Sequence, residues 1–185
     1  QSAGAILDAD GADRDLTAAG AALDAGTQIG VLGASADPLE LSVDTLAAVA
    51  DGDGGINLLE DNGVTVTTVE SLADTTYSAV VQQVQADGTT TTVNKAALSD
   101  LRTTGTTAES GSIVLRVTSG NLTLQDGTGP DDNTAVSANG AGKILLQSLA
   151  GAINANAGVA SEGGSITLRA DGAIAQATGT TIETD

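Results

Sequence analysis

The sequence has no cysteine, histidine, methionine, phenylalanine or tryptophan, and Tyr77 is its one aromatic residue. Without cysteine there is no disulfide framework and no thiolate metal site. Without histidine there is no Ser-His-Asp triad and no imidazole acid–base group. Any core must be built from Ala, Val, Ile and Leu. Because aromatic rings bury the most apolar area per residue, their scarcity favours an elongated, repetitive fold over a rounded domain.

Positive charge is also scarce, with 6 Lys and Arg against 24 Asp and Glu and a formal net charge of -18. A surface of this sign repels phosphate, which argues against nucleic acid and anionic membrane as partners. It attracts cations instead, so calcium is a candidate stabilising ion. Hydrophobic residues still make up 41% of the chain, which favours a folded protein over disorder.

Long apolar runs are missing as well. No stretch of about eighteen apolar residues is present, so we expect no membrane insertion. The first residues lack the basic-then-apolar pattern of a signal peptide. The last residues, 180–185, have the pattern of a strand that is still in progress. We therefore expect an internal piece of a longer protein.

A repeat organises what is present. The segment Gly111–Arg116 recurs as Gly142–Gln147 and Gly164–Arg169, with a looser copy at Gly55–Leu58. The alternation inside each copy places Ile and Leu on one side of a strand and polar residues on the other. Each copy therefore predicts a short, half-buried β-strand.

A second apolar station follows each Ile of the repeat after eight or nine residues, at Val64, Leu122, Ile153 and Ile174. Short strands at this spacing, in units of about 20–22 residues, are typical of solenoids whose units stack as rungs. The glycine before each strand suits a sharp corner. The sequence therefore predicts an all-β fold, a right-handed parallel β-helix.

The repeat divides the chain into three parts. We expect N-terminal β-helix rungs over residues 1–69, a non-repetitive insertion over 70–110, and C-terminal rungs over 111–185. Surplus residues in a solenoid collect at turns rather than in strands. We therefore expect the insertion to leave the coil between two strands.

The insertion contains a hairpin signal and the candidate contact residues of the chain. Two strand-like runs flank Ala86–Gly88, where Asp-Gly supplies the positive φ of a primed turn and predicts a β-hairpin. The following Lys95–Arg102 is compatible with two helical turns. Tyr77, Lys95 and Arg102 are the candidate contact residues for a partner.

Residues 8–15 carry acids at alternating positions around a glycine. Calcium needs six to eight oxygen ligands, so Asp8, Asp10 and Asp13 are candidate metal ligands. The segment departs from an EF-hand loop, which would need a Glu near its twelfth position, and it meets the calcium-binding nonapeptide only in part. A solvated acidic turn is the alternative, since Asp is favoured in turns. No other cofactor is expected.

The pattern of the C-terminal rungs resembles a known family. Gly-Ser-Ile-x-Leu-Arg and Gly-Ala-Ile-x-Ala within 111–185 resemble the repeats of filamentous-haemagglutinin-like exoproteins, giant bacterial adhesins often exported by two-partner secretion. The stretches 29–48 and 54–58 also resemble segments of those proteins. The resemblance implies a secreted protein of the cell surface or extracellular matrix that acts in adhesion, aggregation or biofilm formation. It carries over no catalytic residues.

Three classes of function follow. The first is a structural or adhesive repeat segment whose partners are neighbouring repeats or copies of itself, end to end. The second is a binding module that contacts a host receptor or a polysaccharide through the insertion. The third is a polysaccharide-active enzyme, which needs paired carboxylates and aromatic platforms for sugar rings. Because this chain has almost no platforms, we expect it not to be an enzyme.

Overall fold

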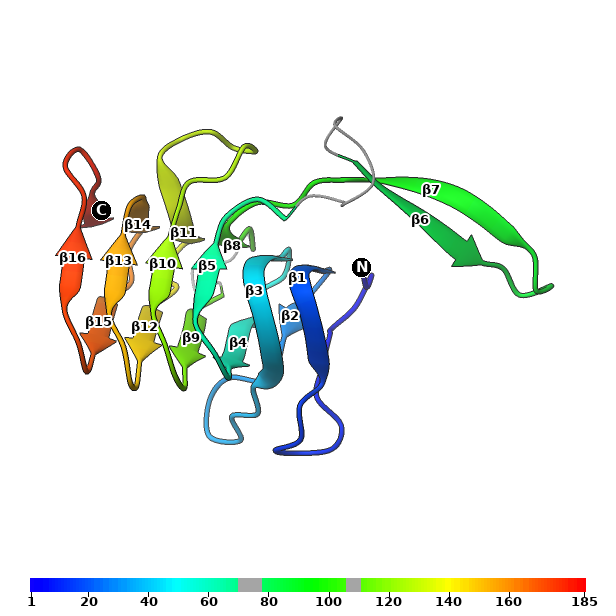
Figure 1. Cartoon of the computed structure of the whole chain (residues 1–185), viewed down its shortest axis with the longest axis horizontal. Helices are drawn as coiled ribbons and strands as arrows, with labels where there is room; N and C mark the ends of the chain where they lie inside the picture. The colour runs from blue at the N-terminus through cyan, green and yellow to red at the C-terminus, as the bar shows by residue number, and fades with distance from the viewer. Residues whose placement is uncertain (70–77, 106–110) are drawn as a thin grey trace.

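The computed structural model describes residues 1–69, 78–105 and 111–185, and only the backbone within the strands at 78–83 and 92–96. The regular elements of this described part are all β-strands. Fifteen strands form one parallel sheet wound into a coil of stacked rungs, and two more form a separate antiparallel pair (Figure 1). The predicted all-β parallel β-helix with an inserted hairpin is confirmed.

The coil has three faces, which we name A, B and C. Face A contains β2 (Gln28–Ile29), β4 (Gly55–Glu60), β9 (Ile113–Val117), β12 (Ile144–Ser148) and β15 (Ile166–Ala170). Face B contains β5 (Val64–Val66), β10 (Leu122–Leu124), β13 (Ile153–Ala155) and β16 (Ile174–Gln176). Face C contains β8 (Leu101–Thr103), β11 (Thr134–Ala138), β14 (Gly158–Ser161) and β17 (Ile182–Thr184).

Two long strands tie the faces together at the N-terminal end. β3 (Leu39–Ala50) pairs in turn with β4, β5 and β8, so one strand contributes to all three faces. β1 (Leu16–Ala25) lies along β3 in parallel register, from Leu16 opposite Leu41 to Ala25 opposite Ala50. Residues 18–23, an Ala-rich stretch within β1, are strand and not helix because their backbone pairs with β3.

The register aligns the copies of the repeat. Ile56, Ile113, Ile144 and Ile166 lie opposite one another on face A and form one inward column. The first three of these side chains are at most 1% exposed. A continuous aliphatic core therefore runs along the coil axis.

The corners of the coil depend on close approach and on small polar side chains. A Cβ added to Gly164 would collide with the carbonyl oxygen of Gly142 in the previous rung. At the corner between faces C and A, the hydroxyls of Thr103 and Ser161 donate to the carbonyl oxygens of Gly111 and Gly142, each at 2.8 Å. These side chains satisfy buried backbone groups that the ladder leaves unpaired at a turn.

Glu60 binds unpaired backbone groups at the corner that follows β4. Its side chain is fully buried, in the inward column that Val117 occupies one rung later. One carboxylate oxygen accepts backbone N–H groups from Val43 at 3.0 Å, Asp61 at 3.1 Å and Asn62 at 3.3 Å. Burial raises the pKa of Glu60, and these three N–H groups oppose that shift. Glu60 is thus a structural carboxylate.

Two long connections leave the coil at one corner, between faces B and C. The first contains β6 (Ser78–Val84) and β7 (Thr90–Ala96), an antiparallel hairpin that projects away from the coil in Figure 1. Gly88 in its turn has a φ of 82°, as the Asp-Gly signal requires. The second connection, residues 125–133, joins β10 to β11.

The two helical turns expected over Lys95–Arg102 are wrong. Lys95 lies in β7, Leu98 forms an antiparallel bridge with Val69, and Arg102 lies in β8. β8 is flanked by β3 and β11, and its backbone bonds to both. This two-sided pairing outweighs a weak local helix preference.

Replacing a single inward side chain should show how much stability the column provides. We expect Leu146→Ala on β12 to lower the free energy of unfolding by about 2–5 kcal/mol, because Leu146 is fully buried and its removal leaves a cavity. Leu145→Ala, one residue away on the outward, partly exposed side, is the matched control and should cost less than about 1 kcal/mol. Urea unfolding followed by circular dichroism measures both, and equal losses would contradict the column.

Candidate functional site

The last rung presents a backbone edge. β15, β16 and β17 each have a described partner strand on one side only. In the rung before, the N–H groups of Ile144, Ile153 and Val159 donate to Ser165, Ala173 and Thr181 at 2.9–3.0 Å. The equivalent groups, at Ile166, Ile174 and Ile182, face away from the described coil. This rung, β15–β17, is called the end rung below.

The end rung also presents apolar side chains. Ile174 is 48% exposed, whereas Ile153 directly beneath it is completely buried. Ile166, Leu168 and Ile182 are only partly buried against the core. The end rung thus combines free hydrogen-bonding groups with open aliphatic columns, which is the surface that each inner rung offers to its neighbour.

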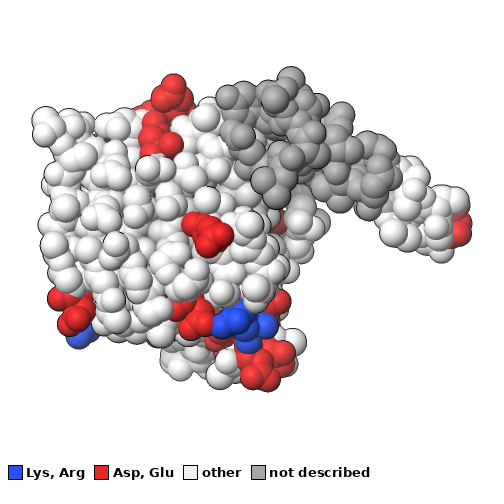
Figure 2. Space-filling view, in the orientation of Figure 1, with Lys and Arg blue, Asp and Glu red and all other residues white. Residues whose placement is uncertain are grey.

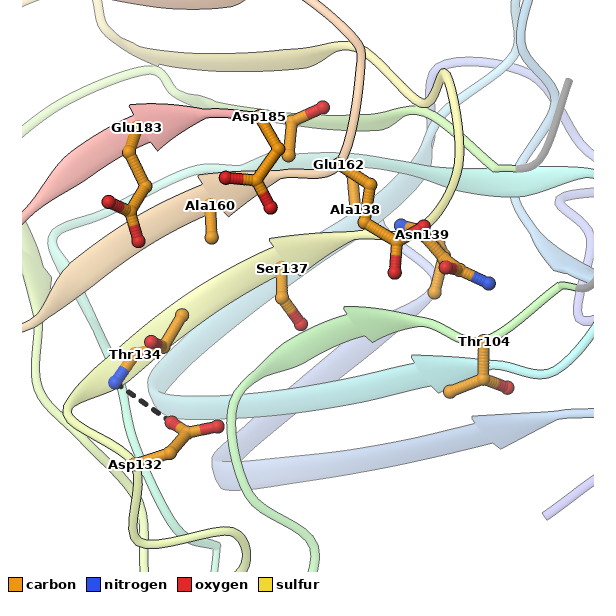
Figure 3. A pocket seen from close by; sticks show the side chains of 12 residues that line it. Thr104, Asp132, Thr134, Ser137, Ala138, Asn139, Ala160, Glu162, Glu183 and Asp185 are labelled. Carbon is orange, nitrogen blue, oxygen red and sulfur yellow. Dashed lines mark hydrogen bonds between the residues drawn. The ribbon is translucent and has the colours of Figure 1, made fainter. Parts of the chain in front are cut away.

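An acidic hollow of about 430 Å³ lies on face C (Figure 3). Asp132, Glu162, Glu183 and Asp185 supply its charge, and no Lys or Arg lines it. Asp132 accepts the backbone N–H of Thr134 at 3.0 Å, which fixes that carboxylate at the rim. The hollow is electronegative and has no aromatic surface on which a sugar ring could stack.

The two connections between faces B and C touch one another. The Thr68 hydroxyl lies 2.8 Å from that of Ser99 and accepts the backbone N–H of Thr128 at 2.7 Å. Asp100 accepts the backbone N–H of Gly127 at 2.8 Å. The base of the hairpin insertion is therefore anchored on the second connection by polar groups.

Asp100 is the buried centre of this anchor. Its side chain is fully buried, and its backbone has a φ of 66°, which Asp and Asn tolerate better than most residues. Burial raises the pKa of Asp100 to about 7. The hydrogen bond from the Gly127 N–H lowers this pKa, and the negative charge of Asp126 raises it. Because its second oxygen has no hydrogen-bond partner among the described residues, the protonated form suits this site.

Of the three candidate contact residues, only Arg102 is described together with its side chain. Tyr77 lies outside the described residues, and Lys95 lies on the hairpin strand β7, where only the backbone is described. Arg102 lies on β8 in the coil, half-buried and opposite Ser137 of β11. Arg102 therefore belongs to face C. The chain returns to the coil at β8, within the segment 70–110 for which we expected only an insertion.

The structure brings two of the three candidate metal ligands together. Carboxylate oxygens of Asp8, Asp10 and Asp15 lie within 4.8 Å of one another, the one such acidic group in the part of the chain that the structure describes. Asp13 is exposed and does not belong to it. Asp15, which sequence reasoning missed, takes its place because it enters β1 beside β3.

Charge is distributed unevenly over the coil. In Figure 2 the acidic side chains gather mainly along the upper and lower rims, whereas the broad surface over face B carries little charge. The outward ladder of face B is Thr65, Thr123, Asn154 and Ala175. On the side of the coil that Figure 2 shows, the negative charge therefore lies mainly at the rims and not on face B.

Comparisons with protein-family models, curated proteins and solved structures give no match for this chain. Within the described ranges, no helix has the length and apolarity needed to cross a membrane.

The buried carboxyl of Asp100 should make stability depend on pH. Its folded pKa of about 7 lies above the unfolded value, so the native state binds more protons and its stability should fall as pH rises from about 4 to 7. We expect Asp100→Asn to match the parent below about pH 4 and to exceed its melting temperature at pH 8, since the amide replaces the protonated acid. Asp131→Asn, an exposed change in the neighbouring connection, should leave the pH profile unchanged, and a profile that Asp100→Asn does not flatten would contradict this role.

Proposed function

We propose that this chain is a structural and adhesive segment of a longer, secreted β-helical fibre of the filamentous-haemagglutinin type. The end rung carries this proposal. Its free N–H groups and half-exposed isoleucines repeat the chemistry by which every inner rung binds the next. We infer that its partner is a further rung of the same kind.

Two further features support a structural role. The core consists of stacked columns, so its length is set by the number of rungs and not by a closed shape. The acids lie mainly in loops and corners, where they keep a long fibre soluble without interrupting the columns. The proposed location is the cell surface or the extracellular matrix.

Adding one rung tests the proposal directly. We expect a second copy of Gly163–Asp185, fused after Asp185, to raise the melting temperature while unfolding stays a single transition. Each newly covered isoleucine of the end rung should contribute roughly 1 kcal/mol, about half the value for a fully buried side chain. Differential scanning calorimetry provides the measurement.

The control has the same length but lacks the apolar side chains that would pack on the end rung. It carries the same added copy with Lys at the positions that match Ile166, Ile174 and Ile182. This version should melt no higher than the parent chain. If the two extended proteins melt at the same temperature, the end rung is not a stacking surface.

A binding module is the second candidate, and the projecting hairpin favours it. The hairpin lies outside the coil and is anchored at its base by Thr68, Ser99 and Asp100. A long loop held on a rigid scaffold is where recognition commonly occurs. Its partner in this reading is a receptor or a glycan.

The hairpin can be removed without disturbing the coil. Val69 donates its N–H to the carbonyl oxygen of Leu98 at 2.8 Å, so a two-residue Asn-Gly turn can replace residues 70–97. We expect this variant to stay folded and to keep rung stacking, with attachment to cells or polysaccharide lost. If the variant still attaches, the hairpin is not the binding element. If the variant no longer stacks its rungs, the hairpin has a structural role.

A further inference from the structure

A fourth carboxylate adjoins the acidic group of Asp8, Asp10 and Asp15. Glu40 lies on β3, opposite Leu59 of β4 on the outward side of the ladder. Burial raises the pKa of Glu40 to about 7, and the carboxyl groups of Asp15 and Asp8 raise it further. Four acids from two distant segments of the chain therefore share one region.

Glu40 is buried and incompletely bonded. Its side chain is only 9% exposed, and its Oε2 atom has no hydrogen-bond partner within the described ranges. A buried carboxylate oxygen without a partner costs free energy unless a positive charge or a proton compensates it. The surroundings of Glu40 therefore favour a bound cation.

The backbone fixes Asp15 beside Glu40. The Asp15 carboxylate accepts the backbone N–H of Glu40 at 2.9 Å, and the Asp15 N–H donates to the carbonyl oxygen of Glu40 at 3.1 Å. Asp8 accepts the N–H groups of Asp10 at 2.8 Å and Gly11 at 2.9 Å, which sets the shape of the loop. Two of the four carboxylates, those of Asp8 and Asp15, are thus positioned by main-chain bonds.

No protein cation neutralises the group in the described structure. Arg14 lies in the same loop, but its guanidinium donates to the carboxylate of Asp61 and forms an ion pair there. That pair is exposed and contributes little by itself. The negative charge of Asp8, Asp10, Asp15 and Glu40 is therefore not balanced by a protein cation within the described residues.

We propose that Asp8, Asp10, Asp15 and Glu40 form a calcium site. Oxygens on opposite sides of a calcium ion are about 4.6–5.2 Å apart, because Ca–O bonds are 2.3–2.6 Å long. The oxygens of the three aspartates, within 4.8 Å of one another, fit one such shell. Magnesium needs a tighter octahedral shell and retains several waters, so it fits less well.

Room for water ligands lies beside the site. Glu40 lines a hollow of about 230 Å³ together with Asp13, Arg14 and Asp61. Calcium accepts six to eight oxygens, and waters commonly complete a shell that carboxylates leave open. Solvent in this hollow supplies the positions that the four side chains do not fill.

A calcium ion here would tie the loop before β1 to the start of β3. Asp8 and Asp10 belong to the loop before β1, Asp15 directly precedes β1, and Glu40 lies near the start of β3. Cross-linking them holds the loop against the coil, where the exposed first half of β1 has no other cover. The ion therefore stabilises this end of the solenoid by binding the folded state alone.

Titration of the metal-free chain with calcium chloride tests the site. Isothermal titration calorimetry at pH 7.5 should give one site with a Kd of about 10⁻⁴–10⁻³ M, the range of extracellular calcium modules, and saturating calcium should raise the melting temperature. Magnesium chloride should give neither result at the same concentration. Asp15→Asn and Glu40→Gln should each weaken calcium binding by roughly tenfold or more, because each removes a charged ligand.

Asp13→Asn is the matched control, since it removes the same charge from the same loop but lies outside the group. It should keep the affinity and the thermal shift of the parent. Glu40→Gln should melt higher than the parent without calcium, because it relieves repulsion among neighbouring acids, and should gain less than the parent at any given calcium concentration. Equal weakening by Asp13→Asn and Asp15→Asn, or no thermal shift in millimolar calcium, would overturn the site.

Discussion

In-register stacking of one rung on the next is the constraint on which the whole molecule depends. An inward side chain such as Leu115 is covered only because Leu58 and Leu146 lie directly above and below it. Adjacent strands are about 4.8 Å apart, so every interior layer is thin. Branched aliphatic side chains fill such layers, and the buried apolar core of the described coil consists of Ala, Val, Ile and Leu alone.

The corners impose a second requirement, since the chain must turn three times in every rung while its backbone stays away from water. Small polar residues meet it inside the coil: Thr103 and Ser161 bind carbonyl groups at one corner, and Glu60 binds three N–H groups at another. Each of these side chains is buried and hydrogen-bonds to the backbone. Buried polar atoms are therefore weak indicators of chemistry in this protein, and Glu40 stands apart because it lies beside the carboxyl groups of Asp15 and Asp8.

The sequence predicts the C-terminal rungs well because their glycine and isoleucine spacing is regular, and the alignment of Ile113 with Ile144 and Ile166 follows from it. It predicts the acidic site only in part. Asp8 and Asp10 share a local pattern, but Asp15 and Glu40 meet through the pairing of β1 with β3, whose alanine-rich segments contain no repeat that sets a register. The strand at Leu101 was missed because its partners are distant in sequence.

Both long connections emerge from the same corner, and Thr68 of the first touches Thr128 of the second. These two connections therefore leave the coil along one line parallel to its axis, whereas the loop of residues 30–38 leaves within face A, between β2 and β3. In the fibre proposed above, connections that leave along one line would face a surface together. Weak individual contacts would then add up by avidity, and the strength of attachment would grow with fibre length.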